Sequence, residues 1–271
     1  MRNDCLLKEK DGVKYLSSPV LSSFGQIIHG FLSRAGGVSS PPFSSLNFDA
    51  RDGDAPENIT ENRRIISRAS GARMERLILV NQVHGNSVVV PDDWKGGAAS
   101  FMPVDADAII SGLTDFPIGI LTADCLPILL HDPVNSVIGA VHAGWRGTVR
   151  SIAVRAIETM QARFGSRPRD IVCAFGPYIG PCCYSVGENV YGEFADAFGF
   201  DLACFKKDSR GLRLDIGEAN AEQLRQKGVL MDNISASPFC TSCRNDLFFS
   251  YRRDGRSTGR QLSFITLRNS R

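Results

Sequence analysis

Six short apolar segments between Arg76 and Ala143 constrain the fold of this chain more than any other feature of its sequence. They are RLILVNQV, NSVVVP, DADAIIS, IGILTAD, LPILLHD and SVIGAVHA, and Gly, Pro, Asp and Asn punctuate them. Segments of this length that are rich in Val, Ile and Leu are typical of β-strands. Because several are apolar at consecutive positions, we expect strands that are covered on both faces.

Helical patterns surround this strand-rich region. A helix is expected over APENITENRRIISRASGA from Ala55, with Asp54 as its cap, Pro56 in the first turn and Gly71 just past the end. A second helix is expected over about 147–164, after the HAGWRG turn. Further elements are helices near 188–198 and 216–227 and strands over DIVCAFG, FFSYRR and QLSFITL. Clustered strands with helices around them indicate an α/β or α+β fold with a mixed sheet.

Composition limits the class of protein. The chain has 271 residues, 43% apolar and 22% charged, and it contains no repeat or long linker, so we expect one domain over residues 1–271. Thirty-one basic residues oppose twenty-nine acidic ones without a dense basic stripe, which argues against a nucleic-acid partner. The sequence leaves the oligomeric state open.

The beginning of the chain, MRNDCLLKEKDGVKYL, is too charged for a signal peptide, and no apolar run approaches the length that crosses a bilayer. We therefore expect a soluble, cytoplasmic protein without a membrane partner. Its eight cysteines are spread along the chain, and reduced thiols are the default in that compartment.

Three potential metal ligands follow strand-like segments in the middle of the chain. They are His84 in NQVHG, Cys125 in TADCLP and His142 in VHAGWRG. Each lies where an apolar run gives way to glycine or proline, so the three side chains could meet at the rim of one sheet. Two nitrogen ligands and one sulfur ligand suit zinc with an open fourth position, the arrangement of a catalytic site.

Charged neighbours extend this prediction. Asp124, beside Cys125, could orient a histidine or act as a general base. Arg146 in HAGWRG offers a planar, bidentate donor for phosphate, beside the amides of a helix start. The alternative for HAGWRG is a structural turn with its tryptophan in the core.

Four other cysteines are interpreted as mostly structural. Cys240 and Cys243 form a C-x-x-C pair, a spacing used by zinc knuckles and redox dithiols, but no partner pair lies nearby in the sequence. A redox or metal role for this pair stays open as the lesser alternative. Cys182 and Cys183 are adjacent, and adjacency fits no simple metal site.

Several ordered motifs resemble one known family. NQVHG, TADCLP, HAGWRG, GPYIGPCCYSVG and FFSYRRDGRSTGR, together with SRAGGVS and SLNF, are similar to the YfiH-type laccase-domain family, known in older naming as multicopper polyphenol oxidases. The resemblance spans nearly the whole chain. It implies β-sheets layered between helices, distantly similar to the catalytic fold of cytotoxic necrotizing factor. It also implies a zinc site whose ligands are His84, Cys125 and His142.

The resemblance implies a choice of activities. Similar proteins are described as purine nucleoside phosphorylases, which convert adenosine, inosine or guanosine and phosphate into base and ribose 1-phosphate. Adenosine deaminase, methylthioadenosine phosphorylase and copper-dependent phenol oxidation are also attributed to them. Four histidines are too few for the copper centres of a laccase, although copper could replace zinc. A metal-free cysteine hydrolase with Cys125 as nucleophile and His142 as base is a further alternative, and a binding protein is the non-enzymatic one.

Site roles follow from the phosphorylase hypothesis. Cys125, His142 and Asp124 are the expected catalytic residues, and zinc is the expected cofactor. Arg146 is expected to hold phosphate, with Arg34 of SRAGGVS as a second anion contact, while Asn47 of SLNF could bind ribose hydroxyls or the base. One departure from the family pattern is Ser185, which follows the tyrosine of CCYSVG where an acidic residue is common. Tyr251, Arg252 and Arg253 match the closing motif of the family. A functional role and a structural one, a final strand with solvated charges, are equally expected for them.

Overall fold

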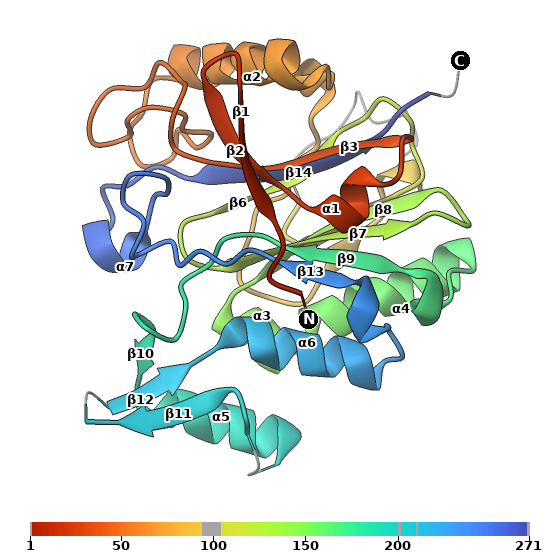
Figure 1. Ribbon diagram of the computed structural model, residues 1–271, viewed down its shortest axis with the longest axis vertical. Coiled ribbons are helices and arrows are strands. Elements are labelled where there is room, and N and C mark those ends of the chain that lie inside the picture. The colour runs from red at the N-terminus through yellow and green to blue at the C-terminus, as the bar shows by residue number, and fades with distance from the viewer. Residues whose placement is uncertain (1, 94–103, 200–201, 210, 270–271) are drawn as a thin grey trace.

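Three β-sheets with flanking helices make up the described part of the chain. The computed structural model describes residues 2–93, 104–199, 202–209 and 211–269, and all the predicted site residues lie within these ranges (Figure 1). Helices and sheets are mixed along the chain, as the sequence pattern predicts. The fold is therefore of the mixed α/β class.

The central sheet has six strands. Their spatial order is β13 (Ile234–Ala236), β9 (Val172–Phe175), β7 (Leu126–Asp132), β8 (Val137–Ala143), β5 (Ala108–Ser111) and β4 (Val88–Val89). The outer pairs β13·β9 and β4·β5 are parallel, whereas the pairs between them are antiparallel. Every residue of β5, β7, β8 and β9 is buried, which confirms strands covered on both faces.

A second sheet packs against the first. Its antiparallel strands are, in spatial order, β1 (Leu6–Lys10), β2 (Val13–Ser17), β3 (Ile27–Leu32), β14 (Gln261–Leu267) and β6 (Ile118–Thr122). Ile120 and Ile265 of this sheet share a buried cluster with Leu129 and Ile138 of the central sheet. Burial of this interface removes apolar surface from water and holds the two sheets face to face.

The described helices are α1 (Pro19–Ser22), α2 (Pro56–Ser70), α3 (Trp145–Val149), α4 (Ile152–Phe164), α5 (Glu188–Phe198), α6 (Ile216–Gln226) and α7 (Tyr251–Asp254). Helices α2, α3, α4 and α6 cover the outer faces of the two stacked sheets. In Figure 1, α2 lies on one side of the stacked sheets and α3, α4 and α6 lie on the other. Ile66 of α2 packs against Phe264 of the second sheet. Ile157 of α4 and Leu224 of α6 pack against Ile128 of the central sheet. The layers thus run helix, sheet, sheet, helix.

A small third sheet stands apart from the stack, at the lower left of Figure 1. It contains β10 (Ser185–Val186), β12 (Gly211–Leu214) and β11 (Phe205–Asp208), all antiparallel. Helix α5 packs on it through Phe194, whose ring makes an edge contact with Phe205 at 5.2 Å between centroids.

Helix boundaries agree in part with the sequence pattern. Helix α2 begins at Pro56 and ends at Ser70, and Gly71 follows in the left-handed conformation with φ +76°, as predicted for a glycine past the helix end. The N-cap, however, is Ala55, and Asp54 instead accepts bonds from the Ala55 amide and the Asn58 side chain.

The expected helix over 147–164 is wrong in its bounds. Helix α3 begins earlier, at Trp145, and α4 begins only at Ile152, because Ser151 adopts the left-handed conformation. A tertiary contact explains the break. The Gln223 side chain of α6 donates to the Thr148 carbonyl, which in a continuous helix would accept the amide four residues later.

Two expected strands are absent from the described secondary structure. RLILVNQV forms only single bridges at Ile78 and Asn81, because the side chain of Gln82 bonds both backbone groups of Leu121 in place of a ladder. In FFSYRR, helix α7 begins at Tyr251, since the Ser250 hydroxyl caps it by accepting from the Arg253 amide. Within the described ranges, the helices are too short or too polar to cross a membrane.

Candidate metal centre and its pocket

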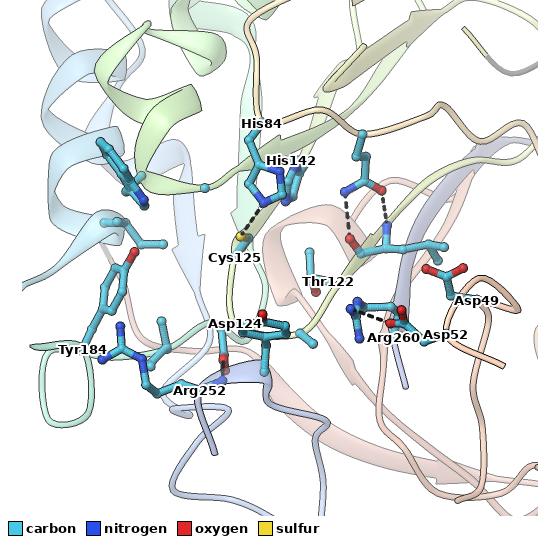
Figure 2. Close-up of a pocket in the computed structure, with 18 of the residues that line it drawn as sticks. Asp49, Asp52, His84, Thr122, Asp124, Cys125, His142, Tyr184, Arg252 and Arg260 are labelled. Atoms are coloured by element: carbon cyan, nitrogen blue, oxygen red, sulfur yellow. Dashed lines mark hydrogen bonds and ion pairs between the residues drawn. The ribbon is translucent and has the colours of Figure 1, made fainter. Parts of the chain in front are cut away.

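A cavity of about 570 Å³ opens where strands β6, β7 and β8 meet their adjoining loops. Its volume is in the usual range for small-molecule sites. His84, Cys125 and His142 all line it, and so does Asp124 (Figure 2). The three residues expected to meet therefore line one pocket, although His84 lies on a loop and not at the end of a strand.

The three predicted metal ligands lie next to one another. Cys125 Sγ is 3.8 Å from His84 Nε2, and the rings of His84 and His142 meet edge to face with centroids 4.8 Å apart. One ligand atom from each residue lies within 4.8 Å of the others. The trio is a possible metal site.

Local backbone geometry creates this proximity. His84 has φ +58°, so the chain turns sharply where its ring leaves the loop, and Asp124 has φ +104° just before Cys125. Gly144 passes close to both ligands: a Cβ there would lie 3.0 Å from His84 Cδ2 and 3.1 Å from Cys125 Sγ. The absence of a side chain at Gly144 keeps the space between the ligands open.

Asp107 orients two of the three ligands. This fully buried carboxylate bonds His142 Nδ1 at 2.7 Å through Oδ1, and it accepts the backbone N–H groups of His84 at 3.0 Å and Gly85 at 2.6 Å. A carboxylate on Nδ1 holds the proton there and leaves Nε2 as the ligand atom. Burial alone would raise the pKa of Asp107, but the bond from His142 and the two amides lower it.

Asp107 is a site residue that was not predicted from the sequence. It directly precedes β5 in DADAIIS, and its signal was an acidic residue next to the apolar residues of a buried strand. A charge in such a position is costly unless it is paired, so the segment itself pointed to a buried partner.

The electrostatics of the trio favour a thiolate. Burial opposes ionisation, but the neighbouring His142 and His84 lower the pKa of Cys125 to about 6. Burial likewise disfavours charge on His142, yet Cys125 and Asp107 raise its pKa to about 9. Cys125 therefore presents sulfur in the anionic form that binds metals and acts as a nucleophile.

The donor set fits zinc. Two imidazoles and one thiolate are typical zinc ligands, a carboxylate fixes one imidazole, and the ligand atoms face a cavity that leaves room for a fourth ligand. The same nitrogen and sulfur atoms also suit copper, so the donor set does not establish the identity of the metal.

Asp124 is placed at the pocket but is engaged in structural bonds. Its Oδ1 accepts from the Thr241 hydroxyl and its Oδ2 from the Arg252 amide, both at 2.6 Å. It lies 8% exposed. Asp124 thus joins the metal-ligand loop to the closing segment of the chain, and the carboxylate that orients His142 is Asp107.

Two predicted substrate contacts lie behind the pocket wall. Asn47 is fully buried: its amide nitrogen donates to the Asp49 carbonyl and to Asp54, and its oxygen accepts from the amides of Asp49 and Arg260. Arg34 bonds the carbonyls of Ser44 and Asn245 and stacks on Phe249. Neither lines the cavity, because both are held by backbone groups of neighbouring loops.

Arg146 lies at the rim. Its exposed guanidinium stacks on Trp145 at 4.5 Å, and Trp145 lines the cavity although Arg146 itself does not. Burial raises the pKa of Tyr184, another lining residue, while the positive charges of Arg252 and Arg146 oppose that rise. Of the two arginines, Arg252 lines the cavity itself.

The pocket also contains polar residues that the sequence analysis did not assign to it. Asp49 and Arg51 form a bidentate pair, with Nη2–Oδ2 2.7 Å. Arg260 pairs with Asp52 at 2.9 Å (Figure 2). Arg252 stacks over Tyr184 at 5.2 Å. Among the described residues, its guanidinium bonds one backbone oxygen, that of Ser185, so further N–H groups remain for an anion. The sequence feature that could have predicted these residues was the group of charges in the ARDGD and TGR segments.

Comparison with known proteins identifies relatives along most of the chain. A family described as multi-copper polyphenol oxidoreductase laccase matches residues 28–268. Purine nucleoside phosphorylase YlmD of Geobacillus stearothermophilus is 37% identical over 252 residues, which cover 89% of this chain and 90% of that protein. A purine nucleoside phosphorylase of Deinococcus radiodurans is 38% identical and covers 94% of each chain.

Solved structures agree with these relatives. The crystal structure of YlmD from Geobacillus stearothermophilus superposes with a TM-score of 0.88 at 34% identity, over 98% of this chain and all of the other. Bacillus licheniformis YfiH, described as a hypothetical protein, gives 0.87 at 30% identity, over 97% of this chain and 99% of that one. The layered arrangement of sheets and helices is thus shared.

Proposed function

The chain belongs to the multi-copper polyphenol oxidoreductase laccase family, the YfiH-type laccase-domain proteins, and we propose that it is a zinc-dependent purine nucleoside phosphorylase. In this reaction phosphate attacks C1′ of the nucleoside, the bond to the purine breaks, and base and ribose 1-phosphate form. The observation that carries the proposal is one cavity that combines the His84, Cys125 and His142 ligand set with arginines and aromatic walls. The names of the relatives support it.

The two sides of the cavity suit different parts of these substrates. Trp145, Tyr184 and Ile216 provide apolar and aromatic surface against which a purine can stack. Asp49 and Asp52, with their arginine partners, supply acceptors and donors suited to ribose hydroxyls. We assign phosphate to Arg252, with Arg146 at the rim as a second contact, because guanidinium groups bind phosphate in a bidentate manner.

Each residue of the metal centre has a definite task in this proposal. His84, Cys125 and His142 hold the ion, and Asp107 keeps the proton on Nδ1 of His142. Bound zinc would supply a Lewis acid for the reacting oxygen or for the departing base. Asp124 holds the Arg252 backbone amide and so keeps Arg252 at the phosphate, and its carboxylate, which lines the cavity beside Cys125, is the proposed proton carrier.

The substrates proposed are adenosine, inosine and guanosine, with adenosine deamination and methylthioadenosine phosphorolysis as further activities of the same pocket. One assay separates them. Metal-replete protein is incubated with adenosine or inosine, with and without phosphate, and the products are identified. Free base and ribose 1-phosphate that form only with phosphate support phosphorolysis, whereas inosine formed from adenosine without phosphate reports deamination. If neither nucleoside is converted, the purine proposal is refuted.

A matched pair of variants tests the phosphate contact. Arg252→Gln removes the cationic group to which we assign phosphate, and we expect the KM for phosphate to rise at least tenfold. Arg256→Gln changes an exposed arginine four residues later that does not line the cavity, and its KM should stay at the wild-type value. An unchanged phosphate KM in Arg252→Gln would remove this residue from the proposal.

A metal-free cysteine hydrolase is the second candidate. The observation that favours it is the lowered pKa of Cys125, about 6, beside His142, whose pKa is raised to about 9. A thiolate next to an imidazolium is the arrangement of cysteine nucleophiles. Metal analysis of protein purified without added metal, compared with His84→Ala, decides between the two. Stoichiometric zinc that is lost in His84→Ala makes Cys125 a ligand, whereas a zinc content unchanged by His84→Ala, with rapid alkylation of Cys125 by iodoacetamide, favours the hydrolase.

A further inference from the structure

A second cluster of ligands lies away from the catalytic pocket. The loop after β9 carries Cys182 and Cys183, and the loop after β13 carries Cys240 and Cys243. The four sulfur atoms all lie within 4.8 Å of one another, with Cys243 Sγ 3.6 Å from Cys182 Sγ and 3.4 Å from Cys183 Sγ. Two pairs that seemed unrelated in the sequence thus form one group.

The fold explains why these distant pairs meet. Strands β9 and β13 are adjacent and parallel, so the loops that follow them leave the same edge of the sheet. Tyr178 and Cys240 continue this pairing as a parallel bridge beyond the strands, and the Thr241 amide donates to the Tyr178 carbonyl. The cluster is therefore built on the central sheet.

The spacing of the sulfurs matches a tetrahedral metal site. Zinc binds thiolates at about 2.3 Å, which places the four sulfurs of a tetrahedron about 3.8 Å apart. The separations of 3.4 and 3.6 Å, within a group no wider than 4.8 Å, agree with that figure. All four residues are free thiols.

Two further contacts suit bound thiolates. The Gly180 amide donates to Cys240 Sγ at 3.3 Å, and a Cβ at Gly180 would lie 3.4 Å from both Cys182 Sγ and Cys240 Cβ, so the backbone closes around the sulfurs. The guanidinium of Arg253 donates to the carbonyls of Thr241 and Ser242, the two residues between Cys240 and Cys243. Because Arg253 is also paired with Asp254 at 2.7 Å, its guanidinium is held in place and braces the loop between Cys240 and Cys243.

We propose that Cys182, Cys183, Cys240 and Cys243 bind a second zinc ion, which has a structural role. Four protein thiolates fill the coordination sphere, so no position is left for substrate. The thiols give up their protons as they bind the ion. This inference does not depend on the proposed catalytic activity, because it concerns a separate group of residues.

The ion would fix one wall of the pocket. The Cys182–Cys183 loop also carries Tyr184, which lines the cavity, and Cys240 precedes Thr241, which bonds Asp124. A zinc ion shared by the two loops would hold both against the pocket. Metal binding at the cysteines would therefore stabilise a surface on which the substrate rests.

The test counts metal ions in the full-length protein. We expect about two zinc ions per chain in the wild type by elemental analysis, and about one in the double variant Cys182→Ser/Cys243→Ser. His84→Ala should lose the other ion. Cys5→Ser alters a buried thiol outside both clusters and should keep both ions.

A second measurement covers the case in which the double variant does not fold. Cobalt is exchanged into wild-type protein and into Cys243→His, which still offers four ligands. Tetrahedral cobalt–thiolate absorption in the wild type supports the site if it is retained with an altered spectrum in Cys243→His. Wild type with a single zinc that disappears in His84→Ala would overturn the proposal. So would a disulfide among the four cysteines, detected by mass spectrometry of protein purified under reducing conditions.

Discussion

Replacement of Asp107 by Asn tests how the metal centre is oriented. The carboxylate receives His142 Nδ1 and the amides of His84 and Gly85, and it is fully buried. Asparagine has nearly the same shape but offers one acceptor oxygen and an NH₂ group. That NH₂ group must face either a backbone N–H or Nδ1 of His142. In the second case it favours the tautomer with the proton on Nε2, the atom needed for the metal.

The magnitude follows from these contacts. Loss of a partner that orients a metal ligand typically lowers metal affinity about 10- to 100-fold, which corresponds to about 1.4–2.7 kcal/mol. If a buried amide of His84 or Gly85 loses its acceptor, folding is destabilised by a further 1–3 kcal/mol or so. We therefore expect zinc affinity and thermal stability both to fall in Asp107→Asn.

The assay equilibrates each protein in zinc buffered by a competing chelator and measures bound zinc per chain. His84→Ala gives the part of the signal that belongs to any other site. Asp105→Asn is the matched control, because Asp105 is two residues earlier, exposed and bonded to Asn81 rather than to a metal ligand. If Asp107→Asn binds zinc as tightly as Asp105→Asn, the orienting role assigned to Asp107 is refuted.

Three further predictions concern packing, pH and metal removal. Gly144→Ala should lower zinc affinity tenfold or more, because its Cβ would lie 3.0 Å from His84 Cδ2. The control Gly192→Ala, in helix α5 with no atom within 4 Å of its added Cβ, should keep zinc and gain about 0.5–1 kcal/mol in stability. Equal zinc affinity in the two variants would count against this prediction. Burial lowers the pKa of His29 from 6.5 to about 4, so between these pH values the unfolded chain binds more protons than the folded one. The free energy of unfolding should therefore decrease by roughly 2 kcal/mol as the pH falls from 7 to 5. Urea unfolding at both pH values should show a smaller decrease in His29→Gln, and an equal decrease would exclude His29 as the source. Chelation of all metal should abolish phosphorolysis, and added zinc should restore it; full activity in protein shown to be metal-free would contradict a metal-dependent reaction.

Local sequence patterns predicted much of the fold because they reflect burial. Consecutive apolar residues in LPILLHD and SVIGAVHA required cover on both faces, and the two stacked layers supply it. Helix α2 was recognisable from Pro56 and Gly71, whose backbone preferences hold without tertiary help. The break between α3 and α4 was not, because it depends on Gln223, which is 75 residues away from Thr148.

The residues of the candidate site also fall into two groups, those that local sequence patterns predicted and those that depend on tertiary contacts. His84, Cys125 and His142 could be found because each follows an apolar segment, and strand ends gather at the edges of sheets. Asp107 could not be paired with His142 from the sequence, since their contact needs the antiparallel pairing of β5 with β8. Asn47 has the polar character of a ligand-binding residue, but its amide is consumed by loop contacts that no local pattern reveals.

A line of bonds connects the two ligand clusters. Cys240 is followed by Thr241, whose hydroxyl bonds Asp124, and Asp124 precedes Cys125 of the His84, Cys125 and His142 trio. The second oxygen of Asp124 holds the amide of Arg252, the proposed phosphate contact. A displacement of the cysteine cluster would thus alter the position of Arg252 through the Asp124 carboxylate. Asp107 holds His84 and His142 through separate bonds that do not involve Asp124. Phosphate binding should therefore depend on the cysteine cluster more strongly than does metal affinity at the trio.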